Sequence, residues 1–318
     1  WSESSTIAIY EGEVDRYETS DVGGVSFRAR IDGKMGYAYT EKLDESSIDF
    51  LIDHVVANAQ SLDEEDGTTL FEGSPSYRTP QFYDASLATI SKETMIERLL
   101  QVEEKLRAYD ERIEKVNMCQ IVSFSSGKAI QNTLGLDVEE QANGLYLVAG
   151  VIVTDGKEKK NGYDVAMIEK WEAFDLDTFV SRVANEALRQ LGSTSIPSGH
   201  YPVVLRQDAA TSLLGVFLTA FSAESVQKGT SRLKGKLNEP IASPHVTIID
   251  NPEDGHLYTR TTFDGEGVAT KKWTIVQEGT LQTFLHNRQT AQKDQVETTG
   301  HAYKPSYKGT LGIAPHHF

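Results

Sequence analysis

An apolar run over residues 145–153 is the feature that most limits how this chain can fold. It is the longest such run in the sequence, and it is far shorter than the roughly 18 apolar residues that a membrane-spanning helix needs. A stretch of this kind is typical of a strand in the middle of a sheet, with other elements covering both faces. The sequence therefore predicts a domain built around a sheet and no membrane partner.

Residues 1–62 are predicted to form a β-meander followed by one helix. Apolar residues alternate with polar or small ones on both sides of Asp32-Gly33, a dipeptide that strongly favours a hairpin turn. From Ser46 to Gln60 the apolar residues instead recur every three or four positions, as in an amphipathic helix. We expect these elements to make a compact first unit.

Residues 63–90 are predicted to be a solvated connector. They begin with the acidic run 63–67 and are then interrupted by Gly73, Pro75 and Pro80. A metal-binding acidic cluster is the alternative for this run, and the composition favours the connector.

Residues 91–195 are predicted to form a middle unit that packs with the first. Ser91 is a good N-cap for a helix whose apolar face recurs from Met95 onward. Further elements are predicted from alternation or helical spacing: strands at 121–124, 145–153 and 163–171, and a helix at 175–191. The segment 193–199, which contains Pro197, is the best domain boundary.

Residues 196–318 are predicted to form a mainly antiparallel β domain, with Glu278-Gly279 as a hairpin turn. Its expected elements are a strand at 201–205, a helix at 208–221, and strands at 245–249, 268–276, 281–285 and 308–313. The predicted fold class is therefore α+β. A mixed α/β region with antiparallel sheets and long amphipathic helices comes first, and the β domain follows.

The chain is acidic, with 31 basic and 47 acidic residues and a net charge of −16. Such a surface repels phosphate backbones, so no nucleic-acid partner is expected. The single cysteine, Cys119, excludes an internal disulfide and suits a reducing compartment. The first residues lack the basic start and apolar stretch of a signal peptide. These features predict a cytoplasmic protein.

The eight histidines do not have the spacing of a helical metal site, because no H-x-x-x-H or H-E-x-x-H pair is present. His316 and His317 are adjacent and are interpreted as a surface pair or as a pair at a truncated end. Cys119 lies in a strand-like stretch, where a buried inert thiol is expected. From spacing alone we predict no metal ligand and no catalytic residue in this chain.

Two carboxylates, Asp264 and Glu266, stand between glycines just before a predicted strand. Glycines on both sides indicate a backbone that needs special dihedral angles or a close approach. The favoured interpretation is a tight turn with outward-facing acids, and a contact with a functional site is the alternative.

Several stretches, in order along the chain, resemble the TldD/PmbA family, whose members have been described as modulators of DNA gyrase. The most specific is residues 263–270, Phe-Asp-Gly-Glu-Gly-Val-Ala-Thr, which is similar to the family's F-D-x-E-G-x-x-T block. The other matching stretches are 23–28 with 36–40, 228–231 with 242–252, 279–282 and 299–302. The resemblance covers essentially the whole chain. Because family chains normally continue well past Phe318, the sequence is expected to be a fragment.

The two branches of this family differ in one segment. TldD-like chains carry H-E-x-x-x-H just before the K-G-T-S stretch, with the Glu as general base for a zinc-bound water. Here the corresponding residues 213–225 contain no histidine, so the chain resembles the PmbA (TldE) branch. The positions of the degenerate motif are Leu214, Val216, Thr219 and Ser222.

The resemblance implies a subunit that holds no cofactor itself and supports a TldD-like, zinc-bearing partner in a cytoplasmic metalloprotease that processes or degrades peptides. The candidate contacts that carry over are Asp264, Glu266, Gly267 and Lys228. A homodimer stays open for the chain without its partner. Two alternatives also stay open: a self-sufficient peptidase whose ligands lie in the missing C-terminal part, and a non-enzymatic binding module of a toxin–antitoxin or gyrase system.

Overall fold

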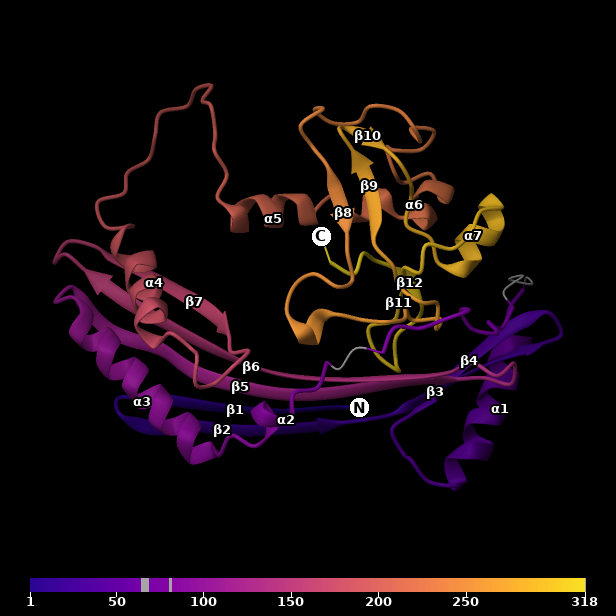
Figure 1. Ribbon diagram of the computed structural model, residues 1–318, viewed down its shortest axis with the longest axis horizontal. Coiled ribbons are helices and arrows are strands. Elements are labelled where there is room, and N and C mark those ends of the chain that lie inside the picture. The colour runs from indigo at the N-terminus through magenta and orange to yellow at the C-terminus, as the bar shows by residue number, and fades with distance from the viewer. Residues whose placement is uncertain (64–68, 80–81, 318) are drawn as a thin grey trace.

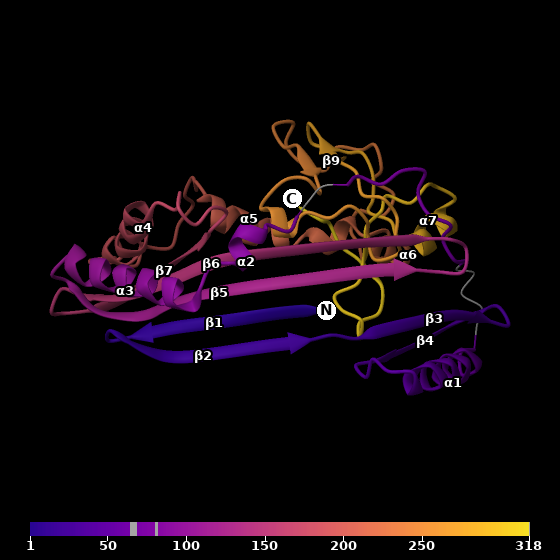
Figure 2. The same cartoon turned by 60° about the horizontal axis from the view of Figure 1, so that its bottom comes forward.

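A long sheet of five antiparallel strands runs through the molecule (Figures 1 and 2). The computed structural model describes residues 1–63, 69–79 and 82–317. The strands, in order across the sheet, are β2 (Glu13–Val22), β1 (Ser2–Tyr10), β5 (Ile113–Gln131), β6 (Asp137–Thr154) and β7 (Lys159–Met167). Strand β6 contains the apolar run 145–153, and every residue of that run is buried or partly buried. The predicted central strand is therefore confirmed.

Two helices pack on one face of this sheet. Helix α3 (Lys92–Tyr109) lies on β1 and β5, and α4 (Leu176–Leu188) lies on β6 and β7. Both begin as the sequence predicted, because the side chains of Ser91 and Asp175 accept hydrogen bonds from backbone N–H groups three residues on. Helix α4 approaches β7 so closely that a Cβ on Gly162 would lie 2.5 Å from the backbone nitrogen of Ala187.

The opposite face of β5 and β6 supports the C-terminal part of the chain. Side chains alternate between the faces of a strand, so Ile121 points to the helices while Phe124 and Lys128 point the other way. The Phe124 ring lies 5.0 Å from the Tyr258 ring, centroid to centroid, and the Lys128 ammonium donates to the carbonyl of Phe263. One face of the sheet is thus covered by helices, and the other face by the C-terminal part of the chain.

A separate unit lies at the far end of the molecule from α3 and α4 (Figure 1). It consists of the hairpin β3 (Val25–Ile31) and β4 (Lys34–Thr40), with helix α1 (Ser46–Gln60) packed on it. The turn at Asp32-Gly33 and the span of α1 are as predicted. The single N-terminal meander is wrong, because β1 and β2 join the five-stranded sheet and β3 and β4 form a sheet of their own.

The connector predicted at 63–90 contains the short helix α2 (Ala85–Ala88). Residues 64–67 of its acidic run lie outside the described residues, as does Pro80. Within residues 1–63, 69–79 and 82–317, none of the helices combines the length and the hydrophobicity needed to cross a bilayer.

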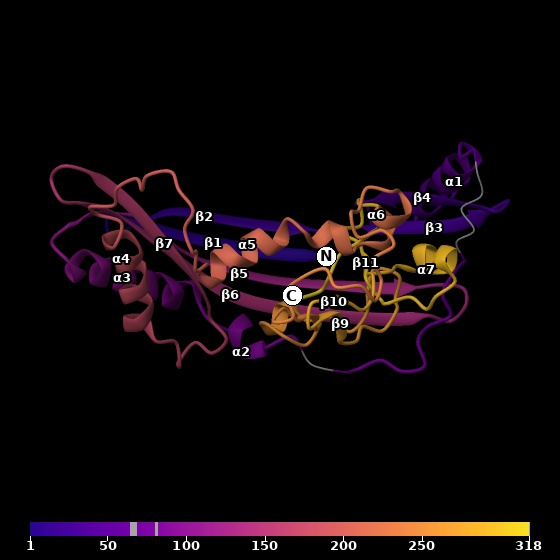
Figure 3. The ribbon, with the colours of Figure 1, turned by 90° about the horizontal axis from the view of Figure 1, so that it is seen from above.

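Residues 218–317, here called the C-terminal lobe, stand over the sheet (Figures 1 and 3). They form two small antiparallel sheets, of order β10-β9-β8 and β11-β12, with short helices around them. The elements are η1 (Leu218–Phe221), α6 (Ala223–Gln227), β8 (Ile248–Asp250), η2 (Leu257–Thr259), β9 (Trp273–Gln277), β10 (Thr280–Leu281), α7 (Arg288–Asp294), β11 (Ala302–Tyr303) and β12 (Gly312–Ile313). The antiparallel α+β class is confirmed, and so is the hairpin at Glu278-Gly279.

Several predicted elements of this region are wrong in extent. Residues 201–205 are exposed and form no strand, and the helix predicted at 208–221 divides into α5 (Gln207–Gly215) and η1. The strands predicted at 245–249, 268–276, 281–285 and 308–313 shrink to between two and five residues each. Much of the lobe is therefore held by loop hydrogen bonds rather than by extended ladders.

Candidate functional site

The carboxylates of Asp264 and Glu266 point into the C-terminal lobe. Their exposed fractions are 2% and 8%, so the interpretation as a turn with outward acids is wrong. Asp264 accepts three backbone hydrogen bonds: Oδ1 from Glu266 and Val268, at 2.8 and 3.0 Å, and Oδ2 from Ala302 at 2.9 Å. Glu266 Oε2 accepts from the backbone N–H of Arg288 at the start of α7. The two acids tie the 262–270 loop to β11 and α7.

Burial raises the pKa of Asp264 to about 6. The N–H of Ala302 opposes this shift, and the nearby charge of Glu266 adds to it. Gly267 completes the turn with a φ of 86°, and a Cβ there would lie 2.6 Å from a methyl carbon of Leu136. The motif at 263–270 thus forms a loop that is hydrogen-bonded to the rest of the lobe and lies close to Leu136.

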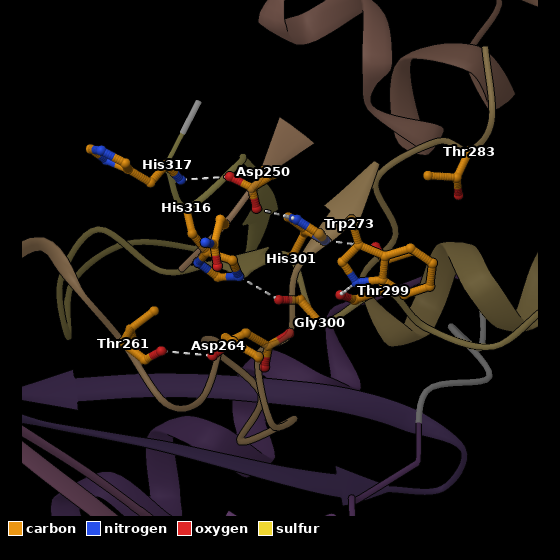
Figure 4. Close-up of polar contacts among 12 residues, drawn as sticks. Asp250, Thr261, Asp264, Trp273, Thr283, Thr299, Gly300, His301, His316 and His317 are labelled. Carbon is orange, nitrogen blue, oxygen red and sulfur yellow. Dashed lines mark hydrogen bonds and ion pairs between the residues drawn. The ribbon is translucent and has the colours of Figure 1, made fainter. Parts of the chain in front are cut away.

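A cluster of three further side chains lies close to this turn (Figure 4). Asp250 ends β8, His301 precedes β11, and His316 follows β12. One potential ligand atom of each lies within 4.8 Å of the others. Asp250 and His301 are completely buried, and His316 is partly buried. The structure therefore brings together two imidazoles and a carboxylate from three segments.

The side chains of this cluster also make hydrogen bonds to neighbouring groups. His301 Nε2 contacts Asp250 Oδ2 at 2.7 Å, while its Nδ1 contacts the Thr299 hydroxyl at 2.8 Å. Asp250 Oδ1 accepts from the backbone N–H of His317 at 2.5 Å. His316 Nε2 donates to the carbonyl of Gly300 at 2.6 Å, and its ring stacks on that of His301 with centroids 4.9 Å apart.

The protonation of the cluster follows from these contacts. Burial by itself would raise the pKa of Asp250, but the hydrogen bonds from His301 and from the His317 N–H outweigh it, so the pKa is lowered. Burial and the neighbouring His301 lower the pKa of His316 to about 4. At neutral pH Asp250 is therefore ionised and His316 is neutral. Because a carbonyl only accepts, the His316 proton is on Nε2 and its Nδ1 carries a free lone pair.

Sequence spacing missed this cluster for a simple reason. Asp250 and His301 are 51 positions apart, and neither lies on a helix with another histidine. The interpretation of His316 and His317 as a surface pair is wrong for His316, whose imidazole is directed into the cluster (Figure 4).

The four positions of the degenerate motif do not form one site. Leu214, Val216 and Thr219 are exposed, on α5 or just after it, while Ser222 is buried at the start of α6. Lys228 is also exposed and forms an ion pair with Glu224 one helical turn earlier. Among the hydrogen bonds and ion pairs of the described residues, none joins Lys228 to Asp264 or Glu266.

Comparisons with known proteins assign all three parts of the chain. Residues 1–59 match domain 1 of the PmbA/TldA metallopeptidases, residues 85–191 match their central domain, and residues 198–318 match their C-terminal domain. The chain belongs to the PmbA/TldD metallopeptidase family. The predicted family is confirmed.

Members of the PmbA/TldD family from distant organisms share the fold. A Thermotoga maritima structure described as a proposed modulator of a DNA gyrase is 33% identical, with a TM-score of 0.88 over 99% of this chain and 70% of that one. TldE from Thermococcus kodakarensis has a TM-score of 0.83 at 22% identity, covering 99% of this chain and 71% of that one, and shows the fold alone.

Curated relatives include both branches. A metalloprotease PmbA homolog of Haemophilus influenzae is 25% identical over 94% of this chain and 68% of the relative. A metalloprotease TldD homolog of the same organism is 27% identical over 89% of this chain and 61% of the relative. Each relative is thus longer than the sequence it shares with this chain. Similarity alone does not separate the branches, and the residues at 213–225 must do so.

Proposed function

We propose that this chain is the PmbA-like (TldE-like) subunit of a two-subunit cytoplasmic metalloprotease that processes or degrades peptides. A TldD-like subunit would supply the zinc and the general base. The observation that carries the proposal is the segment 213–225, which offers no imidazole where TldD-like chains have H-E-x-x-x-H.

The residues at the motif positions do not fit a zinc ion. Structural and catalytic zinc sites use histidine nitrogen, cysteine sulfur or carboxylate oxygen. Leu214 and Val216 have none of these atoms, and Thr219 and Ser222 have only hydroxyl groups. No step of peptide hydrolysis is therefore assigned to this segment. Its role in the proposal is to present a surface.

The same segment supports the partner-dependent part of the proposal. None of the nine residues of α5 is buried. Leu213 and Leu214 are each 50% exposed, and Val216 and Phe217 are 72% and 55% exposed. Contiguous exposed apolar side chains on a folded chain mark a surface that another molecule covers. Figure 3 shows α5 lying across the molecule between α4 and the C-terminal lobe.

A reconstitution assay tests this function. The chain, a TldD-like subunit and their mixture would each be given an unfolded peptide, and cleavage would be followed by mass spectrometry. We expect cleavage by the mixture only, together with a complex in size-exclusion chromatography. Cleavage by this chain alone would contradict the proposal and favour the self-sufficient peptidase. A complex with a toxin–antitoxin or gyrase component but not with the TldD-like subunit would favour the binding module.

A matched pair of variants locates the surface. Leu214→Asp places a charge in the exposed apolar segment and should weaken both the complex and the cleavage by at least tenfold. Ile48→Asp is the control, because Ile48 is also exposed, at 57%, but lies on α1 at the distant end of the molecule. Equal loss in the two variants would show that α5 is not the contact surface.

A further inference from the structure

We propose that Asp250, His301 and His316 together bind one divalent transition-metal ion of the zinc type. This site is separate from the H-E-x-x-x-H motif of TldD-like chains, and it does not depend on the proposed function. It would revise the expectation that the chain holds no metal, while leaving the hydrolytic zinc with the partner.

The ligand set has the chemistry that such ions prefer. Two imidazole nitrogens and one carboxylate oxygen suit zinc, cobalt and nickel, whereas magnesium and calcium prefer oxygen ligands. Sites with three protein ligands hold a water or another ligand in the fourth position. Here that position would be reached from the side of His316, the only one of the three that is not fully buried.

The hydrogen bonds behind the ligands are the strongest argument. A metal-binding histidine normally uses its second ring nitrogen to contact a carbonyl, carboxylate or hydroxyl group, which fixes the ring and its tautomer. His316 does this through Nε2 to Gly300, so its Nδ1 is left with the lone pair. His301 does it through Nδ1 to Thr299, so its Nε2 is the nitrogen that faces Asp250.

The carboxylate is oriented in the same way. Asp250 Oδ1 is held by the backbone N–H of His317, which leaves Oδ2 directed at His301. The distance from Oδ2 to His301 Nε2 is 2.7 Å, and a tetrahedral ion with bonds of about 2.1 Å needs about 3.4 Å between its ligands. A metal ion would thus replace the shared proton and push these two atoms apart by several tenths of an ångström.

Charge favours the exchange. Asp250 has no exposed surface, and a buried carboxylate is costly without a compensating positive charge. A bound cation would also join the end of β8 to the segments flanking β11 and β12, and so stabilise the C-terminal lobe.

Cobalt provides the direct test. The tag-free chain, freed of metal with a chelator, would be titrated with Co²⁺ while the visible absorption is recorded. We expect one equivalent to bind and to give the intense bands of a four- or five-coordinate site. Zn²⁺ should then displace the cobalt, and Mg²⁺ should not. Absence of binding at micromolar Co²⁺ would overturn the proposal.

Variants assign the site to these residues. His316→Gln keeps a donor for Gly300 but removes the free imidazole nitrogen, and it should weaken Co²⁺ binding at least tenfold. The control is His245→Gln, because His245 is exposed and lies outside the cluster. Asp250→Asn gives a second test of the ligand set. Circular dichroism of the metal-free variants shows whether each is folded. Equal Co²⁺ binding by wild type, His316→Gln and Asp250→Asn would refute the assignment.

This readout is independent of peptidase activity. If the reconstitution fails but cobalt binds, the metal site stands without the proposed function. If cobalt does not bind but the two subunits cleave peptide together, the metal site is wrong and the subunit role stands.

Discussion

Replacing Asp264 with alanine should destabilise the C-terminal lobe by several kcal/mol. The side chain is 2% exposed and is the acceptor for three backbone N–H groups at 2.8 to 3.0 Å. A hydrogen bond to a charged group contributes about 1.5–3 kcal/mol, so the three bonds amount to roughly 4–9 kcal/mol. Removing the buried charge offsets about 3 kcal/mol of this loss, because burial raises the pKa of Asp264 by about two pH units. The net loss should be about 1–6 kcal/mol at pH 7.5.

Two measurements check this value. Urea unfolding gives the free energy, and hydrogen exchange followed by mass spectrometry reports on the amides of Val268 and Ala302. Both amides should exchange faster in Asp264→Ala. Asp264→Asn should lose less, about 1–3 kcal/mol, since its amide oxygen can still accept two of the three bonds. The control is Asp137→Asn, an exposed acid whose replacement should change stability by less than about 0.5 kcal/mol. Unchanged exchange at both amides in Asp264→Ala would refute the reasoning.

Three further predictions concern pH, packing and thiol chemistry. Burial raises the pKa of Asp264 to about 6, so the folded chain favours the protonated side chain. The contribution of that protonated form to stability is complete below pH 4 and is lost as the pH rises through 6. In urea unfolding, wild type should therefore lose about 3 kcal/mol between pH 4 and pH 8 relative to Asp264→Asn. Gly162→Ala should lower the free energy of unfolding by about 1–3 kcal/mol in the same assay, because its Cβ would meet the backbone of Ala187 and push α4 away from β7. In the control Gly156→Ser the new Cβ has no atom within 4 Å, so only the strain of its positive φ, about 1 kcal/mol, is expected. Burial raises the pKa of the Cys119 thiol, so a disulfide reagent should label it only in urea; rapid labelling of the folded chain would contradict this.

The parts of the fold that the sequence predicts well are those fixed by local physics. The Ser91 hydroxyl caps α3 wherever that helix packs, and Asp32-Gly33 adopts the positive φ angles of its turn without help from distant residues. The run at 145–153 has no polar face to expose, so a covered central strand is the one arrangement that suits it.

The errors fall where a distant contact overrides the local pattern. Strands β1 and β3 have similar alternation, but only β1 finds a partner in β5, across more than a hundred residues of chain. The apolar residues at 201–205 look like a buried strand, yet Val204 is 97% exposed. The spacing of apolar residues shows which face of a segment would be buried if another element packed on it. It carries no information about whether this chain or another one provides the cover.

The same distinction explains why the candidate site was hidden. A helical zinc motif is visible in sequence because one helix presents two histidines at a fixed spacing. Asp250, His301 and His316 come from three short segments that are positioned by neighbouring residues: Thr299 and Gly300 hold the two imidazoles, and the His317 N–H holds the carboxylate. Those partners are unremarkable in sequence, because a hydroxyl group or a backbone amide can serve anywhere. The geometry becomes specific only when β8, β11 and β12 are packed together. In this chain the missing motif could therefore be read from the sequence, whereas the cluster that can bind a metal ion could be found only in the fold.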